Sequence, residues 1–425
     1  MATEASKLTP RGADLGLRTR AASVVISIAL IMGILLRFGV FFLSGRFGTT
    51  VWSTGNDALA FILLARNVVD HHGLSYAGKL SAYRPPLYPL LISVTMRINA
   101  EQWLVLVRLL QFVSALVTAW ACGKLAQQWG GSRQMAIGLA LWMPTLVFFQ
   151  PEIGTETLAA MMTALWFVCL MYMSAPWSPA IVGVVAGIAA LQRFNAAPLI
   201  LFGPLVLLYY LRDWKRSVLA LSLGLLMLSP WIIRNWLDFG WPIYSTDTGY
   251  ALAVGIVAPT SRSQPGDTEA VRAAIGWVHQ EIESNDAPAN LRDEIKLNRQ
   301  AMSFALGHWR EIPKTWPSKL AAFWLSWDQW SGISGISRLG QMVRRASVLF
   351  YWVILCAALV AGWRLRRRIP YIIAYAALLT LLHLPLPMST RLRVPLLEPV
   401  IIALAACAIT MKPTFSEQRM PADAL

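Results

Sequence analysis

The feature that most constrains this chain is a series of apolar runs, each close to 20 residues long, separated by short charged segments. A bilayer core about 30 Å thick is crossed by a helix of about 20 apolar residues, so runs of this length are typical of membrane-spanning helices. Composition agrees, because 56% of the 425 residues are hydrophobic and 14% are charged, whereas soluble domains carry about a quarter charged residues. The sequence predicts an all-α polytopic membrane protein.

Hydropathy predicts about ten spans, at 22–43, 103–125, 134–149, 156–174, 178–192, 197–211, 217–233, 346–363, 370–385 and 395–411. The predicted organisation is a cytoplasmic tail, a membrane module, an outer-face helical loop, a C-terminal group of membrane helices and a second cytoplasmic tail, at 1–21, 22–233, 234–345, 346–411 and 412–425. A first outer loop, 44–102, lies within the membrane module.

The formal net charge of +15 is concentrated in short loops. Basic clusters precede residue 22 and recur at 212–216 and 364–368, always on the predicted inner side of the spans. Loops rich in Lys and Arg remain cytoplasmic, and anionic headgroups attract them. We therefore interpret the charge as a topology signal and a contact with membrane lipids, not as a surface for nucleic acid.

Two predicted outer segments have helical patterns of their own. In the first outer loop, the apolar spacing from Ala58 to Val69 predicts a helix that lies flat on the membrane and ends at His71-His72-Gly73. In the second segment, 267–284 and 290–307 have the pattern of two amphipathic helices. Both segments are expected on the outer face.

Among the charged residues of the first outer loop are an acid and a base of particular interest, Asp57 and Arg84, the latter in Tyr83-Arg84-Pro85-Pro86-Leu87-Tyr88. Taken singly, Asp57 fits a helix cap and Arg84 fits a headgroup anchor. Charge at the edge of a bilayer is costly, so a pair kept there indicates a functional site. An arginine can bind phosphate bidentately and a carboxylate can act as a general base. Tyr88 and His72 are further candidate substrate contacts.

Other charged residues cluster at predicted outer span ends. Glu152 and Glu156 flank the turn before the fourth span, either as two capping acids or as an acidic pair on one helix face. Four arginines oppose the positive-inside bias and therefore suit anionic partners, whether ordinary anionic lipid or a lipid-linked phosphate: Arg193, Arg234, Arg391 and Arg393.

Several function classes lack support. No histidine spacing predicts a metal, and His71-His72 is interpreted as a solvated turn, with a divalent-cation site as the alternative. Walker loops, serine nucleophile elbows and Rossmann glycine patterns are absent from the sequence. The sequence requires no cofactor.

The order of these motifs resembles the GT-C integral-membrane glycosyltransferases. An acid in the first outer loop, a basic-Pro-Pro-Leu motif after it and a second acid after the third span are similar to the branch of protein O-mannosyltransferases and lipid A aminoarabinose transferase. Pro230-Trp231-Ile232-Ile233-Arg234-Asn235 and Arg391-Leu392-Arg393-Val394-Pro395 also resemble family motifs. The resemblance runs from about Asp57 to Pro399 and is stronger in motif order than in any single motif.

The resemblance implies a transferase that moves a sugar from a polyprenyl-phosphate donor to an acceptor hydroxyl, with inversion, on the periplasmic face of a bacterial inner membrane. It implies that the membrane module 22–233 is catalytic, that Asp57 is the base, and that Glu156 is the second acid, assisted by Glu152. Arg84 corresponds to the basic residue that contacts the donor phosphate, with Arg391 and Arg393 beside it.

Two questions follow from the resemblance. Where the aminoarabinose branch has an acidic metal ligand, this chain has Tyr83, so dependence on a divalent metal is doubtful. The acceptor, whether lipid, glycan or protein, is left open. The rival hypothesis is a transporter or flippase of lipid-linked sugars, which also places charges at span ends but more often shows inverted repeats.

Overall fold

The computed structural model describes residues 10–44, 56–76, 79–246, 248–257, 291–307, 309–310, 312–325 and 338–411. These residues form helices joined by short turns and a two-stranded antiparallel ribbon. Six of the described helices are long and apolar enough to cross a bilayer. The chain is an integral membrane protein with an all-α architecture, as the hydropathy predicts.

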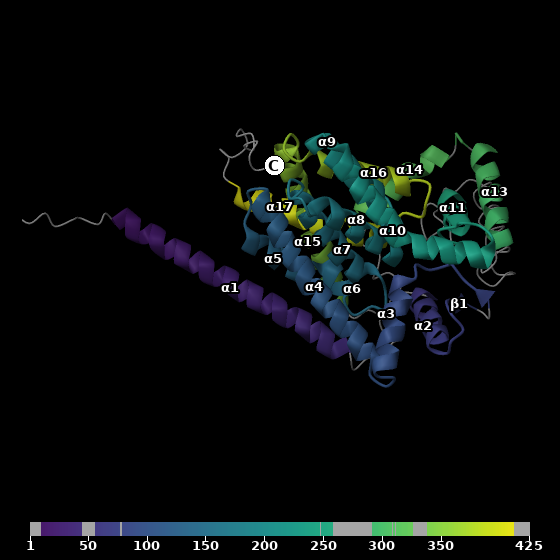
Figure 1. The fold of residues 1–425 in the computed structure, drawn as a ribbon. Helices are drawn as coiled ribbons and strands as arrows, with labels where there is room; N and C mark the ends of the chain where they lie inside the picture. Colours follow the sequence, from purple (N-terminus) through teal and green to yellow (C-terminus); the bar gives the residue numbers. More distant parts are fainter. Residues whose placement is uncertain are drawn as a thin grey trace, which may run out of the picture.

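The first half of the chain begins with α1 (Pro10–Ser44), which projects from the body as a long arm (Figure 1). A loop unit follows, made of α2 (Asn56–Val69), β1 (Ser75–Tyr76), β2 (Lys79–Leu80) and α3 (Leu87–Ile98). The main helical body then contains α4 (Trp103–Gln128), α5 (Arg133–Trp142), α6 (Pro144–Phe149), α7 (Glu156–Met171), α8 (Ser178–Gln192), the short 3-10 helix η1 (Phe194–Ala196), α9 (Leu199–Leu211) and α10 (Trp214–Phe239).

The second half adds α11 (Thr248–Val257), α13 (Leu291–Gly307), the 3-10 helix η2 (Ile312–Thr315) and α14 (Trp316–Trp324), and then the apolar helices α15 (Arg338–Leu365), α16 (Pro370–His383) and α17 (Thr390–Thr410). Of the two amphipathic helices predicted in the outer segment, α13 coincides with 290–307, while 267–284 lies outside the described residues.

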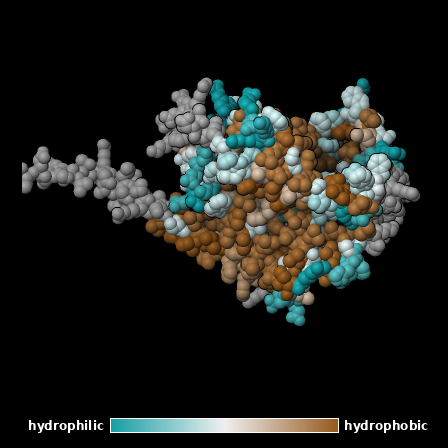
Figure 2. All heavy atoms as spheres, in the orientation of Figure 1, coloured by the Kyte–Doolittle hydropathy of each residue, from teal (hydrophilic) through white to brown (hydrophobic). Residues whose placement is uncertain are grey.

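Hydrophobic residues cover a broad band across the visible face, with hydrophilic residues at its upper and lower margins (Figure 2). Within this body, α17 is central, because 83% of its apolar window is buried against other helices, compared with 11% for α1. The predicted count of ten spans stays a prediction. Besides the six long helices, four described apolar helices are shorter: Leu87–Ile98, Glu156–Met171, Ser178–Gln192 and Pro370–His383.

The predicted span at 134–149 is broken in two, which corrects the sequence expectation. Met143 adopts an extended conformation with ψ of 113°, so α5 ends at Trp142 and α6 begins at Pro144. The cause is Pro144, which disfavours helical geometry in the residue before it and is well suited to the first turn of a new helix.

Arg37 of α1 satisfies the carbonyl groups that this break exposes. Its guanidinium donates to the backbone oxygens of Ala140, Leu141 and Leu146 at 2.6, 2.9 and 2.7 Å, and it is buried. A charged group in a membrane span is tolerated when it is fully hydrogen-bonded in this way. Arg37 thus holds α1 against the α5–α6 break.

Small residues bring α8 and α10 into close contact. A Cβ atom added to Gly183 would lie 2.1 Å from the backbone oxygen of Ala220, and one added to Gly187 would lie 2.7 Å from the oxygen of Gly224. Membrane helices commonly pack through such small residues, which allow backbones to approach. This contact fixes the end of α8, from which Arg193 follows.

The loop unit packs on the helical body through its own apolar cluster. Phe61 and Ala65 of α2 lie against Ile92 of α3, and the ring of Phe61 meets that of Tyr88 edge-on at 5.1 Å. The helix that the apolar spacing from Ala58 to Val69 predicts is therefore present as α2. The cluster holds the beginning of α2, and with it Asp57, against the membrane helices.

Candidate active site

Asp57 stands in the first turn of α2 and is held by two arginines. Its Oδ1 accepts a hydrogen bond from Nη2 of Arg84, and its Oδ2 accepts one from Nη1 of Arg391. Burial raises the pKa of the Asp57 carboxyl, but the charges of Arg391 and Arg84 outweigh burial and leave its pKa below the usual value. Asp57 is therefore an ionised carboxylate with both oxygens engaged.

Arg84 is positioned by the aromatic side chains around it. Its guanidinium lies over the Tyr83 ring, 4.2 Å from the ring centre, and 5.8 Å from the centre of the Phe61 ring. Nη2 also donates to the Tyr83 hydroxyl at 3.2 Å. Pro85 and Pro86 then lead directly into α3. Stacking of this kind holds a guanidinium plane while leaving its edge toward Asp57.

Glu156 opens α7 and is the buried acid of the site. Its side chain is 1% exposed, and its Oε1 accepts from Nε of Arg391 at 2.5 Å and from Nη1 of Arg193 at 2.9 Å. Gly154 makes room for the carboxylate, because a Cβ atom there would lie 2.3 Å from Oε2 of Glu156. The N-terminus of a helix also favours a negative charge at this place.

Arg193 closes the network behind Glu156. It follows α8 in an extended conformation, and its Nη1 also donates to Oγ1 of Thr155 at 2.7 Å. Its Nε donates to Oδ1 of Asn195 at 2.9 Å, and its Nη2 donates to the backbone oxygen of Arg391 at 3.3 Å. Arg193 therefore orients both Glu156 and the first turn of α17.

Five charged side chains from distant parts of the sequence thus form one network: Asp57, Arg84, Glu156, Arg193 and Arg391. Arg391 is its centre because it alone of these five bridges both carboxylates. Three guanidiniums against two carboxylates leave one positive charge in excess. Such an arrangement suits a single negative charge on a ligand.

Two predicted arginines lie elsewhere. Arg393 is fully buried among the helices, where its Nη1 donates to the Tyr351 hydroxyl and lies 3.2 Å from Oε2 of Glu398. Residues two positions apart on a helix are rotated by about 200° around its axis. Arg393 therefore leaves α17 on the side opposite Arg391. Arg234 pairs with Asp238 at 2.6 Å and donates to the backbone oxygen of Ser81 at 3.0 Å, in the loop that carries Arg84.

Tyr88 and Glu152 lie at the back of the network. The Tyr88 hydroxyl accepts from Nε2 of Gln111 at 3.3 Å, and Gln111 also donates to the backbone oxygen of Glu152. Both Tyr88 and Glu152 are buried. They support the turn that leads to Glu156. His72 lies in the exposed turn after α2.

Where the resemblance to the aminoarabinose branch implies an acidic metal ligand, this chain has Tyr83. Tyr83, at the position of that branch's acidic ligand, covers the Arg84 guanidinium instead. Among the described residues, no three His, Cys, Asp or Glu side chains group as a metal site would require. Both carboxylates of the network face arginines.

Sequence reasoning missed three neutral members of the site. Thr155 and Asn195 each bind Arg193, and Asn195 Nδ2 lies 3.4 Å from Nε2 of His383. Nδ1 of His383 lies 2.7 Å from the Leu379 oxygen, so we assign Nδ1 as the donor and Nε2 as the acceptor. The only available signal was the position of Asn195 in Arg193-Phe194-Asn195, directly after a predicted span.

No protein-family model and no curated protein matches the chain. Among solved structures, it is similar to the crystal structure of ArnT from Cupriavidus metallidurans bound to undecaprenyl phosphate. The two chains are 16% identical with a TM-score of 0.40, over 89% of this chain and 77% of that chain.

Proposed function

We propose that the chain is a membrane glycosyltransferase of the GT-C type, which transfers a sugar from a polyprenyl-phosphate donor to an acceptor hydroxyl. The observation that supports this most is the Asp57 carboxylate held between Arg84 and Arg391, with Glu156 and Arg193 behind. Such a network contains a base, a phosphate site and the residues that orient them. The site faces the periplasm of a bacterial inner membrane in this proposal.

The charge of the network favours a phosphodiester donor. A sugar joined to a lipid through one phosphate bears one negative charge, which matches the single positive charge in excess. Arg84 and Arg391 would bind the two free phosphate oxygens, while Arg193 keeps Glu156 in place for Arg391. Since both arginines now engage Asp57, donor phosphate competes with Asp57 for them and frees its carboxylate.

The proposed reaction is a single displacement at C1 of the sugar. Asp57 takes the proton of the acceptor hydroxyl while its oxygen forms the new bond to C1. The bond between C1 and the phosphate oxygen breaks, and its electron pair leaves with the lipid phosphate. That phosphate gains a negative charge, which Arg84 and Arg391 stabilise. Attack opposite the leaving group inverts the anomeric centre.

This sequence of events requires ordered binding. Until donor phosphate engages Arg84 and Arg391, each oxygen of Asp57 accepts a hydrogen bond from one of these arginines, which makes the carboxylate a weak base. The donor therefore binds before the acceptor reacts. Initial-rate kinetics with both substrates varied should show an ordered pattern with the donor first.

The decisive experiment is transfer by the purified protein in liposomes with a panel of polyprenyl-phosphate sugars. Asp57→Asn keeps the shape of the side chain and removes the base, so activity should fall by about a hundredfold or more. Asp70→Asn is the matched control, because Asp70 is an exposed carboxylate one residue past the end of α2.

Turnover that survives Asp57→Asn would eliminate Asp57 as the base. Movement of intact lipid-linked sugar between leaflets, without transfer from any donor, would instead identify a transporter. Loss of activity in Asp70→Asn to the same degree would show that α2 as a whole, and not Asp57, accounts for the effect.

A further inference from the structure

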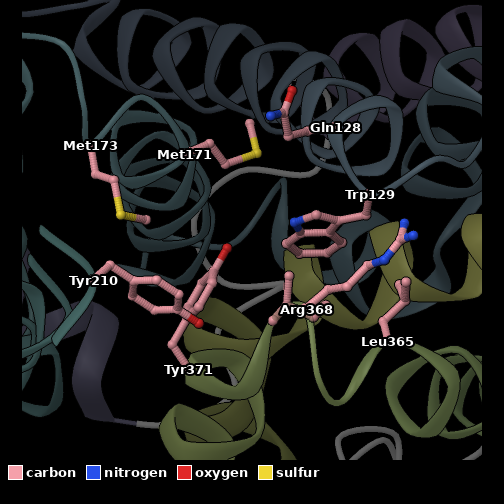
Figure 3. A pocket seen from close by; sticks show the side chains of 9 residues that line it. Gln128, Trp129, Met171, Met173, Tyr210, Leu365, Arg368 and Tyr371 are labelled. Atoms are coloured by element: carbon pink, nitrogen blue, oxygen red, sulfur yellow. The ribbon is translucent and has the colours of Figure 1, made fainter. Parts of the chain in front are cut away.

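A partly open cavity lies at the end of the helical body where α7 ends, whereas the proposed active site lies where α7 begins. Figure 3 shows the side chains that line it. The cavity is formed where α4, α7 and α15 end, beside the last turn of α9 and the start of α16. Helix α7 connects the two places, since it begins at Glu156 and ends at Met171. Sixteen helical residues separate them by about 24 Å.

The wall of the cavity combines aromatic and apolar surface with polar atoms. Trp129, Tyr210 and Tyr371 surround one space, with Met171 beside them and Arg368 next to Trp129 (Figure 3). Rings with one polar atom each are typical of the membrane–water interface. The lining therefore suits a ligand with an apolar part and a polar group.

Two buried donors of this wall point to the nature of that polar group. Among the described residues, the Tyr210 hydroxyl is buried and makes no hydrogen bond, and the buried Trp129 indole nitrogen has only a weak interaction with the Tyr371 hydroxyl. Buried donors are normally paired, because desolvation without a partner is costly. A ligand that brings acceptor oxygens would satisfy both.

The surrounding charge indicates that the ligand is an anion. Segments 124–133, 212–216 and 364–368 carry nine Lys and Arg residues and one carboxylate, Asp213. Asp213 already caps α10 and pairs with Arg216 at 3.3 Å. Arg216 also reaches the cavity margin, where it donates to the backbone oxygen of Met173 at 3.4 Å.

Access to the cavity runs along apolar surface. On α9, Tyr209, which directly precedes Tyr210, is 61% exposed, and Leu205, one turn before Tyr209, is 62% exposed. Exposed apolar side chains on a membrane helix face lipid, so a ligand reaching Tyr210 from this side comes from the bilayer. This favours a lipid over a soluble phosphate.

We propose that this cavity binds the headgroup of an anionic phospholipid in the leaflet opposite the active site. Its phosphate oxygens accept from Tyr210 and Trp129 and face Arg368, while its glycerol and upper chains lie on Met171 and Leu365. Basic pockets between membrane helices bind anionic headgroups in this manner. The site is independent of the proposed transfer reaction, and its failure would leave that proposal untouched.

Native mass spectrometry of the detergent-purified full-length protein tests this site. Phosphatidylglycerol and phosphatidylethanolamine with identical chains are titrated against wild type, Tyr210→Phe and Arg368→Gln. The control is Arg366→Gln, which removes the same charge from an equally half-buried arginine stacked on Trp363 outside the cavity wall. Thermal melting of each variant verifies folding, and Tyr210→Phe keeps the ring in place.

Wild type should retain phosphatidylglycerol in preference to phosphatidylethanolamine, and both cavity variants should weaken it by about threefold to tenfold, the range for one hydrogen bond or charge contact. Arg366→Gln should bind as wild type does. Equal retention of the two lipids would overturn the proposal, as would equal loss in Arg366→Gln and Arg368→Gln. Displacement of the lipid by millimolar inorganic phosphate would reassign the cavity to a soluble anion.

Discussion

At the scale of single residues, Asp57 combines two properties that pull in opposite directions. Burial raises the pKa of its carboxyl, and Arg391 and Arg84 lower it further than burial raises it. The resting form is thus a carboxylate that is stabilised as an anion and consequently weak as a base. Donor phosphate would reverse this, since it adds negative charge and draws both arginines away.

We therefore expect two different acid limbs in the pH profile. Because the pKa of Asp57 is lowered in the free protein, kcat/KM should be flat above about pH 5 and fall only below the usual carboxyl range. In the donor complex the pKa is higher, so the acid limb of kcat should lie at higher pH than that of kcat/KM. Steady-state transfer rates across pH measure both limbs, and coincident limbs would contradict release of Asp57 by the donor.

The same lowered pKa links Asp57 to stability. The carboxylate pairs contribute stability above the pKa of the unfolded chain, about 3.9, and this contribution is lost as the pH falls through the lower pKa of the folded state. Asp57→Asn should accordingly reduce the pH dependence of the melting temperature in this acidic window only.

Glu156→Gln should damage both stability and activity. The neutral amide leaves Arg391 and Arg193 near each other without the buried carboxylate, and breaking a buried ion pair typically costs about 3–5 kcal/mol. Arg391 would also lose its orientation, so kcat should fall strongly. Thermal melting and transfer kinetics measure the two effects, with exposed Glu101→Gln as the control. Unchanged kcat in a folded Glu156→Gln variant would exclude Glu156 from the site.

Much of the charged site could be predicted from the sequence, for a physical reason. Asp57, Arg84, Glu156 and Arg391 are charges kept where a bilayer makes charge costly, and this is visible without a structure. Thr155 and Asn195 are neutral and common at helix ends, so only their contacts with Arg193 reveal a role. Arg393 points into the helical body because of the rotation of α17 around its axis. Hydropathy does not determine this rotation.

At the scale of elements, the site depends on helices whose ends are fixed by close backbone contact or by breaks. Hydropathy located most helices because their apolar content determines them, yet it read 134–149 as one span. It could not foresee that Arg37 would satisfy the exposed carbonyls at this break. That contact joins residues more than one hundred positions apart, beyond any local pattern.

The α8–α10 contact makes a prediction at this scale. Gly183→Ala places a methyl group 2.1 Å from the Ala220 oxygen, so the helices must separate, at a cost of about 1–3 kcal/mol. Gly39→Ala is the matched control, since nothing lies within 4 Å of a Cβ atom there, and alanine is the better helix former. Thermal melting should fall for Gly183→Ala and stay constant or rise for Gly39→Ala; the opposite order would refute the packing.

At the scale of the whole molecule, the candidate active site and the basic loops lie at opposite ends of the helical body. Hydropathy and the positive-inside rule together predict this polarity. In the structure, α7 begins at Glu156 in the candidate site and ends at Met171, near the basic loops. The sequence could not predict which span ends meet, because that depends on how the helices are arranged around α17.

The polarity is testable by cysteine labelling in intact cells. With the four native cysteines replaced by serine or alanine, His72→Cys should react with a membrane-impermeant maleimide added outside. Lys215→Cys, in the first turn of α10, should react only after permeabilisation. Both positions are in exposed turns or first turns, so accessibility is matched. Labelling of both from the same side would invert or abolish the proposed orientation.

The central position of Arg391 has a consequence for how the protein is made. Synthesis proceeds from the N-terminus, so Asp57, Arg84, Glu156 and Arg193 are all in place before α17 leaves the ribosome. Until that final helix arrives, neither acid has the cation that bridges it to the other. During synthesis, Asp57 and Glu156 therefore have only one arginine each, Arg84 and Arg193, and the proposed site is complete only once α17 is inserted and brings Arg391.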